Sequence, residues 1–195
     1  MDSLKVFLPE PSLQKINTWI NELNVQLKIT KPRRTKLGDF KVINHNLFIS
    51  INNDLNPYSF LITLTHELAH AFVYVKYRTR VLPHGYEWQE TFKSMMLNFL
   101  HPEIFPQDIL KALSVHLKSP KASTCTDVDL ARILKKYDDK EALTISDINE
   151  GAFFSTEKGK IFKKGKKLRK RYKCIECMSN KVYLFHPLAE VILVQ

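Results

Sequence analysis

Two histidines and a glutamate in the segment THELAHAF have the spacing of a metal site, and a third histidine follows fourteen residues after the second. Residues i and i+4 of a helix project from the same face, so His66 and His70 can offer two imidazole nitrogens to one metal ion. Glu67 is too close in sequence to be an easy third ligand, but it can accept a proton from water at the metal. This spacing predicts a zinc site in which Glu67 is the general base.

A catalytic zinc site needs three protein ligands and one open position. His84 precedes Gly85 just after a predicted loop at 78–83, and it can supply the third nitrogen. The alternative is that His66 and His70 are polar residues on a partly buried helix. Buried imidazoles without a ligand would lose hydration without compensation, which argues against this alternative. The apolar neighbours that would bury them are Leu64, Leu68, Ala69, Phe72 and Val73.

The two histidines must lie on one helix for this geometry to hold. Asn56 followed by Pro57 is a typical helix start, and the helical pattern runs to about Tyr77. Apolar residues spaced at three and four predict further helices at 12–27, in YEWQETFKSMMLNFL and in QDILKALSVHL. Two short strands are predicted in FKVINHNLFISIN, around a turn at 44–46.

The sequence changes in character after residue 118. The segment KSPKASTCTDVD is small and polar, and Thr126 or Asp127 could cap a short helix, DVDLARILKKY. From residue 143 onward, short β-like runs alternate with Gly, Ser, Asn and Pro, which is typical of a small barrel-like module. We therefore predict an α+β protein with a metal-site domain at 1–118, a linker with a short helix at 119–142 and a β-rich module at 143–195.

Positive charge is concentrated at one end of the chain, which has 195 residues and a formal net charge of +10. Ten of the sixteen residues in KGKIFKKGKKLRKRYK, at 158–173, are Lys or Arg. A solubilising surface is the alternative, but this density interleaved with apolar side chains favours sequence-independent phosphate contacts with nucleic acid. The candidate contact residues are Lys163, Lys164, Lys166, Lys167, Arg169, Lys170, Arg171 and Lys173.

The chain has three cysteines and no basic region followed by an apolar leader, which predicts reduced thiols in the cytoplasm. Its longest apolar stretch is interrupted by two histidines and a glutamate, so no membrane span is expected.

Cys174 and Cys177 form one CxxC pair, which is half of a structural zinc site. His186 and the distant Cys125 could complete it, but a second CxxC pair is missing. The alternative, two small residues near a hairpin turn at 178–181, needs no metal. We therefore expect one Zn²⁺ per chain.

Four segments, TKLGDFKV, HNLFISIN, NPYSFLITLTHELAH and HGYEWQETF, resemble the SprT-like (Spartan-related) zinc metalloprotease family, over roughly residues 10–118. The resemblance implies a zincin-type fold, zinc held by His66, His70 and His84, and Glu67 as the catalytic glutamate. It also implies proteolysis near DNA, notably of proteins crosslinked to it. Many relatives carry a four-cysteine zinc ribbon after this domain, which the single CxxC pair does not match. We expect an SH3-like barrel or a degenerate zinc ribbon instead.

Two functions remain open on these grounds. The first is a zinc metalloprotease, of HExxH type, held near nucleic-acid-bound protein substrates by the basic module. The second is a non-catalytic zinc-containing protein that binds nucleic acid through the same module. The intact Glu67 favours the first, because a protein without activity has no need of a carboxylate at that position. We expect the chain to be a monomer.

Several other residues near the site have alternative roles. A second electrophile could come from Tyr74, Tyr77 or Tyr86, and none is preferred. Glu87 and Glu90 could orient His84, although a solvated helix face explains them equally. A substrate could add as a strand alongside LFISIN. The remaining histidines, His45, His101 and His116, are assigned to ordinary structure.

Overall fold

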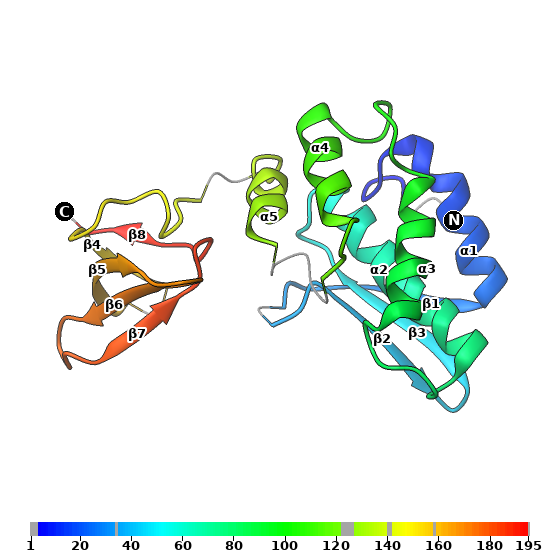
Figure 1. Ribbon diagram of the computed structural model, residues 1–195, viewed down its shortest axis with the longest axis horizontal. Coiled ribbons are helices and arrows are strands. Elements are labelled where there is room, and N and C mark those ends of the chain that lie inside the picture. Colours follow the sequence, from blue (N-terminus) through cyan, green and yellow to red (C-terminus); the bar gives the residue numbers. More distant parts are fainter. Residues whose placement is uncertain (1–3, 34, 122–126, 140–141, 158, 195) are drawn as a thin grey trace. The chain divides into compact units, whose positions relative to one another are not determined.

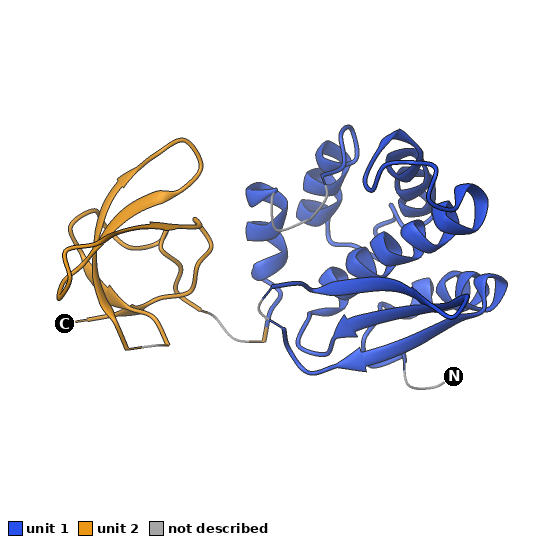
Figure 2. Ribbon diagram, turned by 90° about the horizontal axis from the view of Figure 1, so that it is seen from below, with its two compact units in different colours: residues 1–138 blue, residues 139–195 orange. Residues whose placement is uncertain are grey.

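The computed structural model describes residues 4–33, 35–121, 127–139, 142–157 and 159–194. The chain is α+β and forms two compact units, residues 1–138 and 139–195 (Figure 2). The division lies inside the segment expected to be a linker, and the short helix of that segment belongs to the first unit. None of the helices in the described ranges combines the length and the apolar character needed to cross a membrane.

The first unit contains one three-stranded sheet and five α-helices within its described residues (Figure 1). In chain order, its elements are η2 (Glu10–Ser12), α1 (Leu13–Leu23), β1 (Val25–Thr30), β2 (Gly38–Ile43), β3 (Asn46–Asn52), α2 (Pro57–Tyr77), α3 (Tyr86–Leu97), α4 (Gln107–His116) and α5 (Val128–Lys135).

The first helix is shorter than its sequence pattern predicts. It was expected to reach residue 27, but α1 ends at Leu23 and the next residues form β1. Asn24 takes a left-handed conformation, with φ 51° and ψ 45°, which ends the helix. The apolar residues after Asn24 continue the helical spacing by coincidence, and in the structure they belong to β1, which pairs with β3.

The sheet has the strand order β1-β3-β2, with β1 parallel and β2 antiparallel to β3. A tight turn at Asn44 and His45 joins β2 to β3, and both residues have positive φ, as a two-residue hairpin turn requires. Because β3 is paired on both sides, the expectation that a substrate adds alongside LFISIN is wrong. The strand next to it, β2, has one edge unpaired among the described strands.

Helix α2 is the centre of the first unit. The side chain of Asn56 accepts a hydrogen bond from the backbone N–H of Ser59 at 2.9 Å, and Pro57 is the first helical residue, so the helix begins and ends as predicted. It contacts β2 and β3 as well as α1 and α3. Packing against several elements explains why α2 is apolar on most sides. Its residues without solvent exposure include Phe60, Leu61, Ile62, Leu64, Leu68, Ala69 and Ala71.

The second unit is β-rich, as predicted. Its strands are β4 (Phe153–Ser155), β5 (Ile161–Lys167), β6 (Tyr172–Glu176), β7 (Val182–Phe185) and β8 (Ile192–Leu193), in the antiparallel order β7-β6-β5-β4-β8. The first of the predicted β-like runs, at 143–145, is not a strand: it forms an isolated bridge between Thr144 and Glu190. A separate small core holds the unit together, and its apolar members are Ile145, Ile148, Phe154, Phe162, Cys174 and Val191. The SH3-like or zinc-ribbon description stays a prediction.

Candidate metal centre

The three histidines singled out by their spacing converge on one point. Helix α2 carries His66 and His70 one turn apart, and the loop after α2 returns His84 to them just before α3 begins. The Nε2 atom of His70 lies 3.2 Å from that of His66 and 2.9 Å from that of His84. The Nε2 atoms of His84 and His66 are 3.2 Å apart. Within the described residues, this is the group of His, Cys, Asp and Glu side chains that could hold a metal ion.

These distances fit a tetrahedral metal ion. Zinc binds histidine nitrogen at about 2.0–2.1 Å, which places two tetrahedral ligand nitrogens roughly 3.3–3.4 Å apart. The observed separations of 2.9–3.2 Å need to expand only slightly to match. Three nitrogens in a triangle leave the fourth tetrahedral position open.

The imidazoles are held in the neutral form that a metal ligand requires. Burial, together with the neighbouring imidazoles of His70 and His84, lowers the pKa of His66 to about 2. Burial and then His84 lower the pKa of His70 to about 4, and burial lowers that of His84. At neutral pH the three rings therefore keep a nitrogen lone pair available for a cation.

An indole ring supports the cluster. Trp88 on α3 has no solvent exposure, and its ring centroid lies 4.5 Å from that of His66, 5.3 Å from that of His70 and 4.8 Å from that of His84. Phe92 stacks on Trp88 at 5.1 Å and 9°, which fixes the indole in turn. Trp88 was not predicted as part of the site, although its place four residues after His84 on a predicted helix was a usable signal.

The third histidine is presented by an unusual backbone. His84 has a φ of 58°, and its carbonyl accepts a hydrogen bond from Nε2 of Gln89 at 3.3 Å. Gly85, the N-cap of α3, donates its N–H to the carbonyl of Leu82 at 3.0 Å. Gln89 therefore anchors His84, whereas neither Glu87 nor Glu90 makes a described hydrogen bond to it.

The carboxylate of Glu67 lies on the side of α2 that faces β2. Glu67 is 8% exposed, and burial followed by the nearby charge of Asp39 raises its pKa to about 7. A hydrogen bond with the backbone of Phe40 opposes this increase. A cation held by the three histidines would oppose it too, because positive charge favours the ionised carboxylate. The side chain is thus buried beside the candidate centre and titrates near neutral pH.

Gly38 makes room for that carboxylate. A Cβ atom added at Gly38 would lie 2.7 Å from Oε1 of Glu67 and 2.8 Å from the methyl carbon of Thr63. Gly38 is the first residue of β2. An isolated glycine in a strand signals a close approach by another group, and that signal was overlooked.

The three candidate tyrosines and two glutamates have different surroundings. Tyr74 lines a pocket beside His70 and His84, and the guanidinium of Arg78 lies 5.2 Å from its ring centroid. Tyr77 packs under Lys76, and Tyr86 is 74% exposed. Both glutamates face a groove between α1, α2 and α3, where Glu90 pairs with Lys93 at 2.7 Å.

The remaining histidines lie outside the cluster. His45 is in the β2–β3 turn and His101 is an exposed residue near Glu103. His116 is 3% exposed, and its Nδ1 lies 2.9 Å from Oδ2 of Asp127.

The cysteine pair is not part of a described metal group. Cys174 is buried in the core of the second unit and Cys177 is exposed. Neither joins His186 in a cluster of ligand atoms within the ranges that the structure covers. Cys125, the distant fourth candidate, lies outside the described residues.

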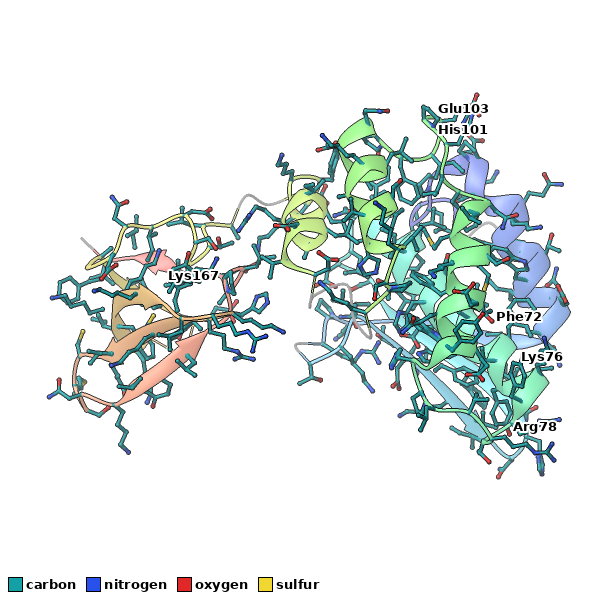
Figure 3. All side chains as sticks on the ribbon, viewed as in Figure 1. Phe72, Lys76, Arg78, His101, Glu103 and Lys167 are labelled. Carbon is teal, nitrogen blue, oxygen red and sulfur yellow. The ribbon has the colours of Figure 1, made fainter. Side chains whose placement is uncertain are left out.

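One of the eight predicted nucleic-acid contact residues, Lys164, is buried. Lys164 is 6% exposed, and its Nζ donates to the carbonyl of Ile148 at 2.5 Å and lies 4.2 Å from the ring centroid of Tyr172. The ammonium group therefore makes its contacts inside the unit and is not available to a phosphate in solution. The other seven candidates are exposed: Lys163, Lys166, Lys167, Arg169, Lys170, Arg171 and Lys173. Figure 3 shows Lys167 on the second unit.

A comparison with protein families finds that the sequence model of the SprT-like family matches residues 10–107. This chain belongs to the SprT-like family. The SprT-like match includes every residue of the histidine cluster together with Glu67, Gly38 and Trp88, and it ends before the second unit begins. SprT-like proteins are generally associated with metalloprotease activity. A search of curated proteins finds none that matches the chain.

Proposed function

We propose that the first unit is a zinc-dependent peptidase with a zincin-type fold, in which His66, His70 and His84 hold one zinc ion and Glu67 is the general base. The observation that carries the proposal is the near-tetrahedral spacing of three Nε2 atoms, with a buried carboxylate on the same helix. Three protein ligands leave the open coordination position that distinguishes catalytic from structural zinc sites.

The chemistry follows from the residues around the centre. When bound, zinc supplies Lewis-acid chemistry: it polarises a carbonyl oxygen and lowers the pKa of water. The carboxylate of Glu67 takes the proton of the attacking water and delivers it to the leaving amine. Burial keeps that carboxylate a stronger base than an exposed one. Trp88 and Phe92 cover the imidazole rings and hold them in place.

We propose that the substrate binds along the open edge of β2 and not alongside β3. An extended peptide can add to an exposed sheet edge through main-chain hydrogen bonds. Strand β2 contacts α2, and its first residue, Gly38, lies against the carboxylate of Glu67. A peptide on this edge would bring its backbone near the general base.

We further propose that the second unit binds nucleic acid through sequence-independent phosphate contacts. The seven exposed Lys and Arg residues named above support this role, and Lys164 is left out because its ammonium group is buried. Under this proposal the substrates are proteins bound or crosslinked to nucleic acid, and the chain works as a cytoplasmic monomer.

Glu67→Gln tests the peptidase. The full-length, zinc-loaded chain is incubated with an unfolded protein substrate, with and without DNA. Cleavage is expected to fall by about 100-fold or more, the contribution typical of general acid–base catalysis, while zinc content and DNA affinity stay unchanged. Glu90→Gln is the matched control, because that carboxylate is 48% exposed on α3.

If the Glu67→Gln variant cleaved the substrate as fast as the wild-type chain, the proposed mechanism would be wrong. A wild-type chain that binds one zinc ion and DNA but cleaves nothing would support the alternative, a non-catalytic zinc-containing protein that binds nucleic acid.

A further inference from the structure

A small pocket opens directly beside the three histidines. Its volume is about 280 Å³, and two members of the cluster, His70 and His84, form part of its wall. The rest of the lining is mostly apolar and includes Phe40, Tyr74, Val81, Leu82 and Trp88. A larger groove of about 800 Å³ lies between α1, α2 and α3, but none of the three histidines lines it.

We propose that the pocket of about 280 Å³ binds one large apolar side chain of the protein substrate, aliphatic or aromatic, next to the bond that is cut. This inference rests on the proposed peptidase function and specifies its substrate class.

The position of the pocket supports this role. Because His70 and His84 line both the pocket and the candidate metal centre, a group bound in the pocket would lie directly beside the imidazoles that would hold the ion. Phe40 comes from β2, an edge strand of the described sheet. Alternate side chains of a peptide paired with β2 would point to the same face of the sheet. Phe40 of β2, the strand along which the substrate would bind, thus forms part of the pocket wall.

The size and chemistry of the pocket select the side chain. Pockets for drug-sized ligands measure roughly 300–1000 Å³, so about 280 Å³ suits a single large side chain. No Asp or Glu lines the pocket, and its one charged residue, Arg78, would repel Lys or Arg. The guanidinium of Arg78 already lies over the ring of Tyr74, at 5.2 Å from the centroid. Figure 3 shows Arg78 beyond the end of α2.

The outer wall of the pocket is formed by the loop after α2. The loop at 79–83 is bounded by Arg78 and His84, which both have positive φ, at 57° and 58°. The N–H of Arg78 donates to the carbonyl of Tyr74 at 2.8 Å, and the N–H of Gly85 donates to that of Leu82 at 3.0 Å. Backbone hydrogen bonds therefore fix both ends of the loop that carries Val81 and Leu82.

The first test compares peptide substrates that differ at one position. Internally quenched peptides of one sequence carry Phe, Leu, Ala, Asp or Lys at each position in turn around the cleaved bond, and the full-length, zinc-loaded chain cleaves them. At one position, Phe and Leu are expected to exceed Ala in kcat/KM by at least about tenfold, and Lys is expected to be the poorest. Equal rates, or a preference for Asp or Lys at every position, would overturn the proposal.

Two variants of one wall residue change the pocket in opposite directions. Val81→Trp fills the pocket and should bring Phe substrates down to the rate of Ala substrates. Val81→Ala enlarges it and should raise the rate for Trp relative to Phe. Val115→Trp is the control, because Val115 is 63% exposed on α4 and does not line the pocket. An unchanged order of substrates in both Val81 variants, each with normal zinc content, would overturn the proposal.

A binding measurement separates this inference from the peptidase itself. The chain has two tryptophans, so Trp19→Phe leaves Trp88 in the pocket wall as the sole reporter. In a Trp19→Phe, Glu67→Gln chain, N-acetyl-phenylalaninamide should change the fluorescence of Trp88 saturably, and N-acetyl-alaninamide should not. Saturable binding in this chain, together with no cleavage of any peptide by the zinc-loaded wild-type chain, would refute the peptidase and keep the pocket. Glu67-dependent cleavage without side-chain preference or saturable binding would keep the peptidase and refute the pocket.

Discussion

Gly38 lies directly against the carboxylate of Glu67: a methyl group added at Gly38 would come within 2.7 Å of Oε1. The first residue of the edge strand thus sets how far the general base can move toward the sheet. Gly38→Ala should displace the carboxylate, and a misplacement of about 1 Å can cost on the order of 100-fold in rate. The histidine cluster contains neither residue, so zinc content should not change.

Steady-state cleavage and zinc content of Gly38→Ala check this expectation. Gly159→Ala is the control, because its φ of 73° makes alanine unfavourable there but no atom lies within 4 Å of the added Cβ. Equal activity in Gly38→Ala and wild type would show that the carboxylate tolerates a shift.

Loss of the third histidine should weaken metal binding. His84→Ala leaves His66 and His70 as a two-nitrogen site, so the protein purified without added metal should hold much less than one zinc per chain. Zinc should then raise the melting temperature of wild type but not of the variant, because only a ligand that binds the folded state stabilises it. Elemental analysis and thermal unfolding with and without zinc measure both effects. His101→Ala, at an exposed position, is the control.

Two zinc ions per wild-type chain would contradict the single site, and would point to Cys174 and Cys177. Full zinc occupancy of His84→Ala would remove His84 from the ligand set.

The pair formed by His116 and Asp127 should make stability depend on pH. Burial alone would raise the pKa of Asp127, but hydrogen bonds from His116 and from the Leu130 N–H, with the charge of Lys121, lower it below 3.8. A carboxylate with a lowered pKa stabilises the fold fully above its unfolded value, and this contribution disappears as pH falls through the folded value. Asp127→Asn should therefore cost about 1–2 kcal/mol at pH 7 and progressively less below about pH 4.

Urea unfolding of the metal-free protein at pH 7, 5 and 3 measures this difference. Asp129→Asn on the same helix is the control, since its side chain is 90% exposed. A cost for Asp127→Asn that is the same at pH 3 and pH 7 would rule out a role for the carboxylate charge.

Exposed basic residues of the second unit should set the salt dependence of DNA binding. Replacing Lys166 and Lys170 by Gln removes two charges, so the slope of log K against log salt should become shallower by about 2. Lys181→Gln removes an exposed charge outside the basic segment and should leave the slope nearly unchanged. Fluorescence anisotropy with duplex DNA at several salt concentrations gives the slopes. Identical slopes for all three proteins would exclude this surface.

Local signals predicted the elements that carry the site. Asn56 and Pro57 mark the start of α2 by capping chemistry, and the four-residue spacing of His66 and His70 fixes their common face. The end of α1 was not predictable in the same way, because the left-handed conformation of Asn24 competes with an uninterrupted apolar pattern.

Features that depend on contacts between distant parts of the chain could not be predicted from the sequence. The central place of β3 results from pairing with β1 on one side and β2 on the other, and no local pattern encodes strand order. The burial of Lys164 is equally non-local, since the carbonyl that receives its ammonium group belongs to Ile148, sixteen residues away.

The third histidine comes from a loop, whereas the other two come from a helix. A metal ion bound by all three would tie the loop at 79–83 to the middle of α2, where His66 and His70 lie. Val81 and Leu82, which wall the pocket, belong to the fastened segment. Metal binding and pocket binding are therefore thermodynamically linked: a substrate that fills the pocket should raise the affinity for the ion, and removal of the metal should weaken binding of an apolar side chain in the pocket.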